Sequence, residues 1–183
     1  MLDEYQSLTR EQDPYYGLVK YKKRRNLDHY FKGITSEVGG LLSACGYRDK
    51  IEKCGDVFWY IARFCDEFDR FSFAELYHNR VVVTSGSVPS ITLLGLSRLA
   101  NQLSLWEIKG DGDVDTRITR EDEFLFGLVS ILSACLSYVQ CESQDMGVIY
   151  GDAGLLEDII ESNVRKALIQ TPRKVIHGQT EDA

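Results

Sequence analysis

Three carboxylates share one stripe of a predicted helix in the first third of the chain. Asp49, Glu52 and Asp56 are spaced i, i+3 and i+7, which places them on one side of an α-helix. The apolar run 57–61 follows directly. A carboxylate beside a buried apolar segment loses hydration, and a cation or hydrogen bonds must compensate for that loss. The stripe therefore either faces water or holds a metal ion, and the spacing leaves both interpretations open.

A fourth candidate carboxylate, Glu37, lies on the predicted helix that precedes this one. The segments 36–41 (SEVGGL) and 52–60 (EKCGDVFWY) resemble the core of the MazG-like, all-α nucleoside triphosphate pyrophosphohydrolases, which reads EExGEL and EExGDVLWY. In that family, carboxylates from two helices bind Mg²⁺ or Mn²⁺ and activate a water that attacks the α-phosphorus. The resemblance implies a nucleotide hydrolase that releases a nucleoside monophosphate and pyrophosphate, with Glu37 and Asp56 as catalytic metal ligands.

Two positions depart from the family pattern. Gly40 and Lys53 stand where the family has metal-binding glutamates. Glu52 is a candidate replacement ligand, although it lies one residue before the usual position, about 100° round the helix. Alternatively, acids of the second half of the chain supply the missing ligands, and these are Glu121, Asp122 and Glu123.

Lys53 also supports a different account. An ammonium group in place of a metal-binding glutamate can hold phosphates, but it does not readily generate a metal hydroxide. The alternative function is therefore a catalytically inactive MazG-like protein that binds or sequesters a nucleotide, or a helical interaction scaffold.

The last predicted helix carries two further candidate residues. Residues 156–168 resemble the closing element of the family, of the type Leu-Glu-x5-Asn-x-x-Lys-Leu. The resemblance implies that Asn163 and Lys166 face the nucleotide and its phosphates. Because they are one turn apart, they share a face of the helix. With Lys53 they form the expected substrate-binding set.

Hydrophobic periodicity predicts an all-α protein with a single domain. Residues 1–80 are expected to hold an N-terminal helix over 2–12 and a first helical hairpin. The first helix of this hairpin is expected to begin at Leu27 or Asp28 and to run through Leu42, with Gly39-Gly40 interrupting its ladder of apolar residues. Residues 91–142 repeat this plan weakly and predict a second hairpin, whose second helix is expected to begin at an N-cap on Thr119. A closing helix follows over 155–170. The expected architecture is a MazG-like helical bundle with a duplicated helical hairpin.

Composition limits the partners. The 183 residues carry a net charge of −7, which argues against general nucleic-acid binding. The five cysteines form no Cys-x-x-Cys pair, so we expect reduced thiols. The first ten residues do not resemble a secretory signal, and no apolar run is expected to reach the length of a membrane span. Together these observations predict a cytoplasmic protein without membrane contact. A homodimer is expected if the apolar helix faces exceed what one chain can bury.

Overall fold

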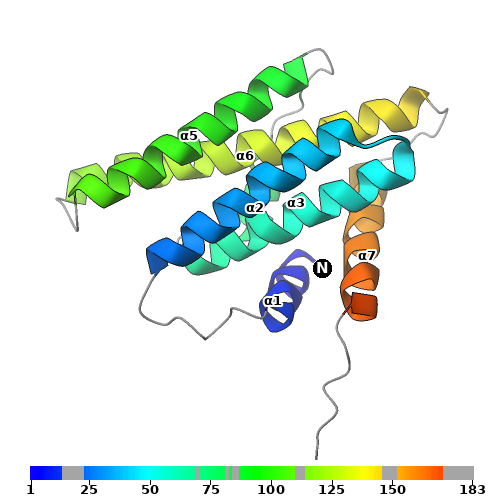
Figure 1. The fold of residues 1–183 in the computed structure, drawn as a ribbon, viewed down its shortest axis with the longest axis horizontal. Helices are drawn as coiled ribbons and strands as arrows, with labels where there is room; N and C mark the ends of the chain where they lie inside the picture. Colours follow the sequence, from blue (N-terminus) through cyan, green and yellow to red (C-terminus); the bar gives the residue numbers. More distant parts are fainter. Residues whose placement is uncertain are drawn as a thin grey trace, which may run out of the picture.

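The computed structural model describes residues 1–13, 23–68, 71–80, 83, 87–109, 114–145 and 152–170, and every regular element within them is a helix (Figure 1). The prediction of an all-α protein is confirmed for this part of the chain. The helices are α1 (Leu2–Gln12), α2 (Lys23–Ser43), α3 (Tyr47–Phe68), α4 (Phe73–His78), α5 (Val88–Lys109), α6 (Val114–Asp145) and α7 (Asp152–Gln170).

The long helices form two antiparallel hairpins. In the first, the turn between α2 and α3 contains Gly46 at a φ of 92°, a conformation that glycine adopts without strain. In the second, α5 and α6 approach closely at two glycines, since a Cβ on Gly95 would lie 2.8 Å from the carbonyl oxygen of Gly127. Whether the second hairpin is a duplicate of the first stays a prediction.

Helix α3 is the centre of the molecule, because it packs against α1, α2, α4, α6 and α7. It runs antiparallel to α6: Lys50 near its start pairs with Glu142, and Phe64 near its end packs on Phe124. Figure 1 shows α1 and α7 on the side of α3 opposite to α5 and α6. The central position follows from sequence, since α3 has buried apolar residues around much of its circumference, including Cys54, Val57 and Phe58.

Two predicted helix boundaries were wrong. Helix α6 begins at Val114, five residues before the expected N-cap at Thr119, because residues 114–119 contain no glycine or proline to prevent helix formation. Helix α2 begins at Lys23, before the expected start at Leu27 or Asp28, and it continues through Gly39-Gly40 as expected. The buried neighbours Val38 and Leu41 hold that turn in the core, which outweighs the weak helix propensity of glycine.

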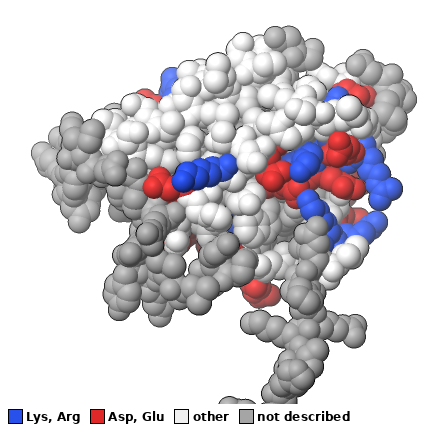
Figure 2. All heavy atoms as spheres, in the orientation of Figure 1, with Lys and Arg blue, Asp and Glu red and all other residues white. Residues whose placement is uncertain are grey.

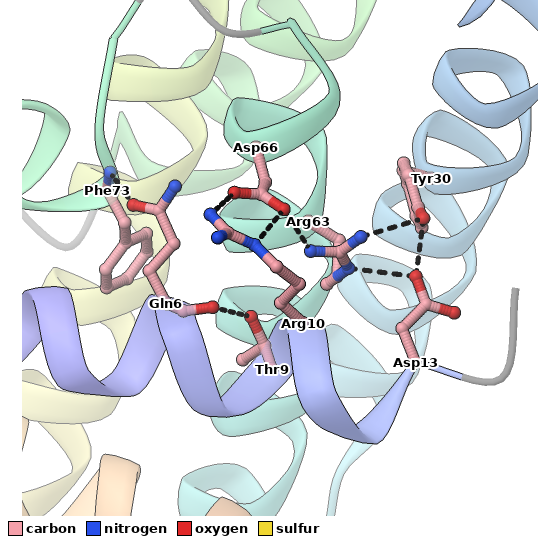
Figure 3. A network of polar contacts seen from close by, with 8 residues as sticks. All are labelled: Gln6, Thr9, Arg10, Asp13, Tyr30, Arg63, Asp66 and Phe73. Carbon is pink, nitrogen blue, oxygen red and sulfur yellow. Dashed lines mark hydrogen bonds and ion pairs between the residues drawn. The ribbon is translucent and has the colours of Figure 1, made fainter. Parts of the chain in front are cut away.

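A buried polar network fastens the end of α1 to α2 and α3 (Figure 3). The guanidinium of Arg63, whose side chain is fully buried, donates to Asp13 at 2.9 Å and to Asp66 at 2.5 Å. Arg10 also pairs with Asp66, and Tyr30 donates to Asp13 at 2.5 Å. Burial disfavours ionisation of Asp66, but the hydrogen bonds from the two arginines outweigh it and lower its pKa. Each buried charge thus has a partner, and α1 is held against α3.

One described stretch, Asp122–Gln144 of α6, is long and apolar enough to cross a bilayer. The expectation that no run reaches this length was therefore wrong. The same stretch is 67% buried within the bundle, as the core helix of a compact protein also would be.

Candidate functional site

The structure brings Glu37 and Asp56 together around the ammonium group of Lys53. The Nζ atom of Lys53 lies 3.0 Å from a carboxylate oxygen of Glu37 and 3.7 Å from one of Asp56. Antiparallel packing of α2 on α3 places the three side chains at one level of the hairpin. The two carboxylates are 23% and 13% exposed, so their charges are only partly hydrated and need a counter-charge.

Gly40 provides the space for this lysine. A Cβ added at Gly40 would meet the side chain of Lys53 at 3.3 Å, and a longer side chain would compete for the same volume. The two departures from the family pattern therefore compensate each other, with a missing side chain on α2 and a cationic one on α3.

Helix α7 completes the cluster from the other side. Lys166 pairs with Asp56 at 2.5 Å, and the amide of Asn163 donates to the same carboxylate at 3.3 Å. Asn163 and Lys166 share one face of α7, as their spacing predicts. Helix α7 comes this close because Gly55 has no side chain, since a Cβ there would lie 2.8 Å from Cβ of Asn163. We call Glu37, Lys53, Asp56, Asn163 and Lys166 the Lys53 cluster.

Tyr5 of α1 is a member of this site that the sequence did not indicate. Its buried hydroxyl donates to the amide oxygen of Asn163 at 3.0 Å, which leaves the amide nitrogen directed at Asp56. The two residues are 158 positions apart, and an aromatic residue on the first helix carries no local sign of this contact. The network on Arg63 thus helps the site indirectly, because it holds the helix that bears Tyr5.

The electrostatics of the cluster are balanced without a metal ion. Two ammonium groups, on Lys53 and Lys166, face the two carboxylates of Glu37 and Asp56. The hydrogen bond to Glu37 raises the pKa of Lys53 and, with the charges of Glu37 and Asp56, outweighs the effect of its partial burial. Lys53 therefore stays protonated at neutral pH.

The residues present do not fit the divalent cation that the family resemblance implies. Glu37 and Asp56 are held by lysines, and Glu52 pairs with Arg48 at 3.5 Å. Among the described residues, no three or more His, Cys, Asp or Glu side chains converge in a metal-binding group. Mg²⁺ prefers a shell of oxygen ligands, and an ammonium group inside that shell would repel it.

The two described candidates of the second hairpin, Asp122 and Glu123, do not supply the missing ligands either. Glu123 pairs with Arg98 at 3.2 Å, and Asp122 is exposed; the side chain of Glu121 lies outside the described residues. The adjacent Phe124 packs on Phe64, two turns or about 12 Å along α3 from Asp56.

A cavity of about 550 Å³ lies beside the Lys53 cluster, between the first turns of α3 and the second half of α7. We call it the α3–α7 pocket. Lys166 belongs to both the pocket and the cluster and thus connects them. Figure 2 shows charged side chains of both signs gathered over this end of the molecule, whereas the face over α5 and α6 carries few charges. The lining combines apolar with charged and polar side chains, namely Tyr47, Arg48, Ile51, Glu52, Asp158, Glu161, Ser162, Arg165, Lys166 and Ile169.

The buried cysteines are not nucleophiles at physiological pH, because burial raises the pKa of each thiol. All five are free thiols, as expected, and Cys54, Cys65 and Cys135 are buried. Burial raises the pKa of Cys135 to about 12, so it is a neutral thiol at physiological pH.

Comparison with known proteins adds no relative. No protein-family model, no curated protein and no solved structure matches this chain. The functional argument consequently depends on the site itself and on the motifs of the sequence.

Proposed function

We propose that this protein is a MazG-like bundle that binds a nucleotide without hydrolysing it. The observation that carries the proposal is the position of Lys53 Nζ between Glu37 and Asp56. A hydrolase of this kind needs both carboxylates for a metal that activates water. Here an ammonium group lies where that metal would bind, and it does not coordinate a water or generate a metal hydroxide.

The size and lining of the α3–α7 pocket support nucleotide binding. Its volume of about 550 Å³ lies within the range of about 300–1,000 Å³ that is typical of small-molecule sites. Tyr47 and Ile51 give it an apolar part against which a base can pack, and Lys166 and Arg165 give it cationic groups that can bind phosphate.

Each cluster residue has a defined task in this proposal. Lys166 is 34% exposed, so its ammonium group can leave the ion pair with Asp56 and bind a phosphate oxygen at the edge of the pocket. Lys53, 35% exposed, keeps Glu37 and Asp56 neutralised while the phosphate is bound. Asn163, fixed by Tyr5, holds Asp56 in place when Lys166 releases it.

The rival is the Mg²⁺-dependent or Mn²⁺-dependent pyrophosphohydrolase expected from the family resemblance. One observation favours it: a single cationic atom already lies within 4 Å of both Glu37 and Asp56. The two carboxylates therefore face one common cation position, which Lys53 occupies. We derive no catalytic step from this arrangement, because Lys53 occupies it.

Two measurements on one panel separate the candidates. Calorimetric binding and pyrophosphate release are recorded for ribo- and deoxynucleotides, with Mg²⁺, with Mn²⁺ and with a chelator. We expect binding without release. Metal-dependent release that is lost in Asp56→Ala would instead establish the hydrolase. Absence of both binding and release would leave the helical scaffold.

A charge reversal at Lys53 tests the placement of the site. Lys53→Glu places a third carboxylate beside Glu37 and Asp56, and we expect it to create measurable Mg²⁺ affinity that the wild type lacks. Lys32→Glu is the matched control, since Lys32 is exposed on α2 and makes the same charge change elsewhere. Equal Mg²⁺ binding by the two variants would show that the carboxylates do not converge as described.

A further inference from the structure

The α3–α7 pocket is balanced in charge, and this balance restricts the ligand that it can hold. Three lining residues are basic, Arg48, Arg165 and Lys166, and three are acidic, Glu52, Asp158 and Glu161. The neighbouring residues Lys53, Glu37 and Asp56 add one positive and two negative charges. The described site therefore offers no net positive charge to a polyanion.

The paired state of the basic groups strengthens this restriction. Lys166 is bound to Asp56 at 2.5 Å, and Arg48 pairs with Glu52 at 3.5 Å. A phosphate that binds Lys166 takes the place of the carboxylate of Asp56. One anion is exchanged for another, so the Coulomb energy of Lys166 changes little. Of the lining residues, Arg165 and the paired Arg48 then remain to bind a second or third phosphate, which also lies among the three acids of the pocket, where like charges repel.

The apolar part of the pocket points to the same ligand. Ile51 is buried, and Ile169, 77% exposed, stands at the edge. Covering exposed apolar surface of this kind is favourable, at about 25 cal/mol per Å². Most of the affinity then comes from the base and sugar, and one anionic group fixes their orientation on Lys166.

We infer that the α3–α7 pocket takes a nucleoside monophosphate and discriminates against the corresponding triphosphate. This inference rests on the proposed function and specifies its ligand. It differs from the expectation set by the family resemblance, in which a metal ion neutralises the triphosphate. Without the metal, the selectivity of the site is reversed in favour of the less charged nucleotide.

The test is a calorimetric series over one base: the nucleoside and its 5′-mono-, di- and triphosphate, in a chelator, at low and at high salt. We expect the monophosphate to bind most tightly and the affinity to fall about threefold with each added phosphate at low salt. High salt should reduce these differences, because it screens exposed charges.

Each other outcome overturns a defined part of the argument. Affinity that rises from mono- to triphosphate would overturn this inference and leave nucleotide binding intact. A nucleoside that binds as tightly as its monophosphate would also overturn it, because Lys166 would then contribute nothing. Failure of every member to bind would overturn the proposed function itself.

Removal of one acid from the pocket provides a sharper test with a matched control. Glu161→Gln deletes a charge from the lining, and we expect the triphosphate to gain about threefold in affinity while the monophosphate gains less. Glu157→Gln makes the same change one turn away on α7, at an exposed position outside the lining, and should alter neither affinity. Both positions are exposed, so neither variant disturbs the core. Equal effects of the two substitutions on both nucleotides would overturn the inference.

Discussion

The close approach of α3 and α7 at Gly55 predicts the effect of a single methyl group. In Gly55→Ala the new Cβ would lie 2.8 Å from Cβ of Asn163 and 3.1 Å from the carbonyl oxygen of Ile159. Carbon atoms prefer separations of about 3.5–4.0 Å, so α7 must move away by roughly 0.7 Å or more. That movement separates Asn163 and Lys166 from Asp56.

The size of the effect follows from two opposing contributions. Overpacking of this kind costs about 1–3 kcal/mol, whereas replacing a helical glycine by alanine stabilises a helix by up to about 1 kcal/mol. We expect a net loss of about 0.5–2 kcal/mol in the free energy of unfolding. For a chain of this length that corresponds to a fall in Tm of about 1–8 °C.

The assay is urea and thermal unfolding followed by far-ultraviolet circular dichroism, with Gly39→Ala as control. Gly39 lies inside α2, four residues before its end, and an added Cβ would meet nothing within 4 Å outside its own stretch of helix. Alanine there should therefore raise stability by about 0.5–1 kcal/mol. If Gly55→Ala proved as stabilising as Gly39→Ala, the reasoning about the contact between α3 and α7 would be refuted.

Three further predictions concern the core, the pH dependence and the oligomeric state. Arg63→Met leaves two buried carboxylates without their shared partner and should lower the free energy of unfolding by about 3–5 kcal/mol. The control is Arg48→Met, at a side chain that is 91% exposed, which should change the free energy of unfolding by less than about 0.5 kcal/mol. Similar losses in the two variants would contradict the buried network. The pKa of Asp66 is lower in the folded state, so its stabilisation is present above its unfolded pKa near 4 and is lost as the pH falls through the folded value. Urea midpoints measured between pH 6 and pH 2 should therefore fall less steeply in Asp66→Asn than in the wild type. Parallel profiles would show that Asp66 does not contribute to the loss of stability in acid. The homodimer expected from sequence stays a prediction, and the exposed apolar side chains of α5 are its candidate interface. Leu93→Lys, at a residue that is 66% exposed, should therefore reduce the mass found by light scattering to that of one chain. A wild-type protein that is already a monomer would contradict the dimer.

Local sequence patterns predicted the helices well and the polar contacts poorly. The bounds 2–12 of α1 were predicted from apolar spacing, and the structure has the same bounds. Arg63 shows the limit of this reasoning. It lies in an apolar run of α3, where a long cationic side chain is expected to extend its charged group into solvent. The side chain of Arg63 is instead fully buried, because Asp13 at the end of α1 and Asp66 of α3 pair with it.

The sequence by itself determined that this chain is helical, that Glu37 and Asp56 lie on neighbouring helices, and that Asn163 and Lys166 share a face. These are consequences of periodicity along one helix, which is a local property. Only the tertiary structure decided what the carboxylates bind. Lys53 between Glu37 and Asp56, and Tyr5 on Asn163, are contacts between different helices. Their existence depends on how closely the helices pack, and the glycines at 40 and 55 set that distance through the shape of the folded core.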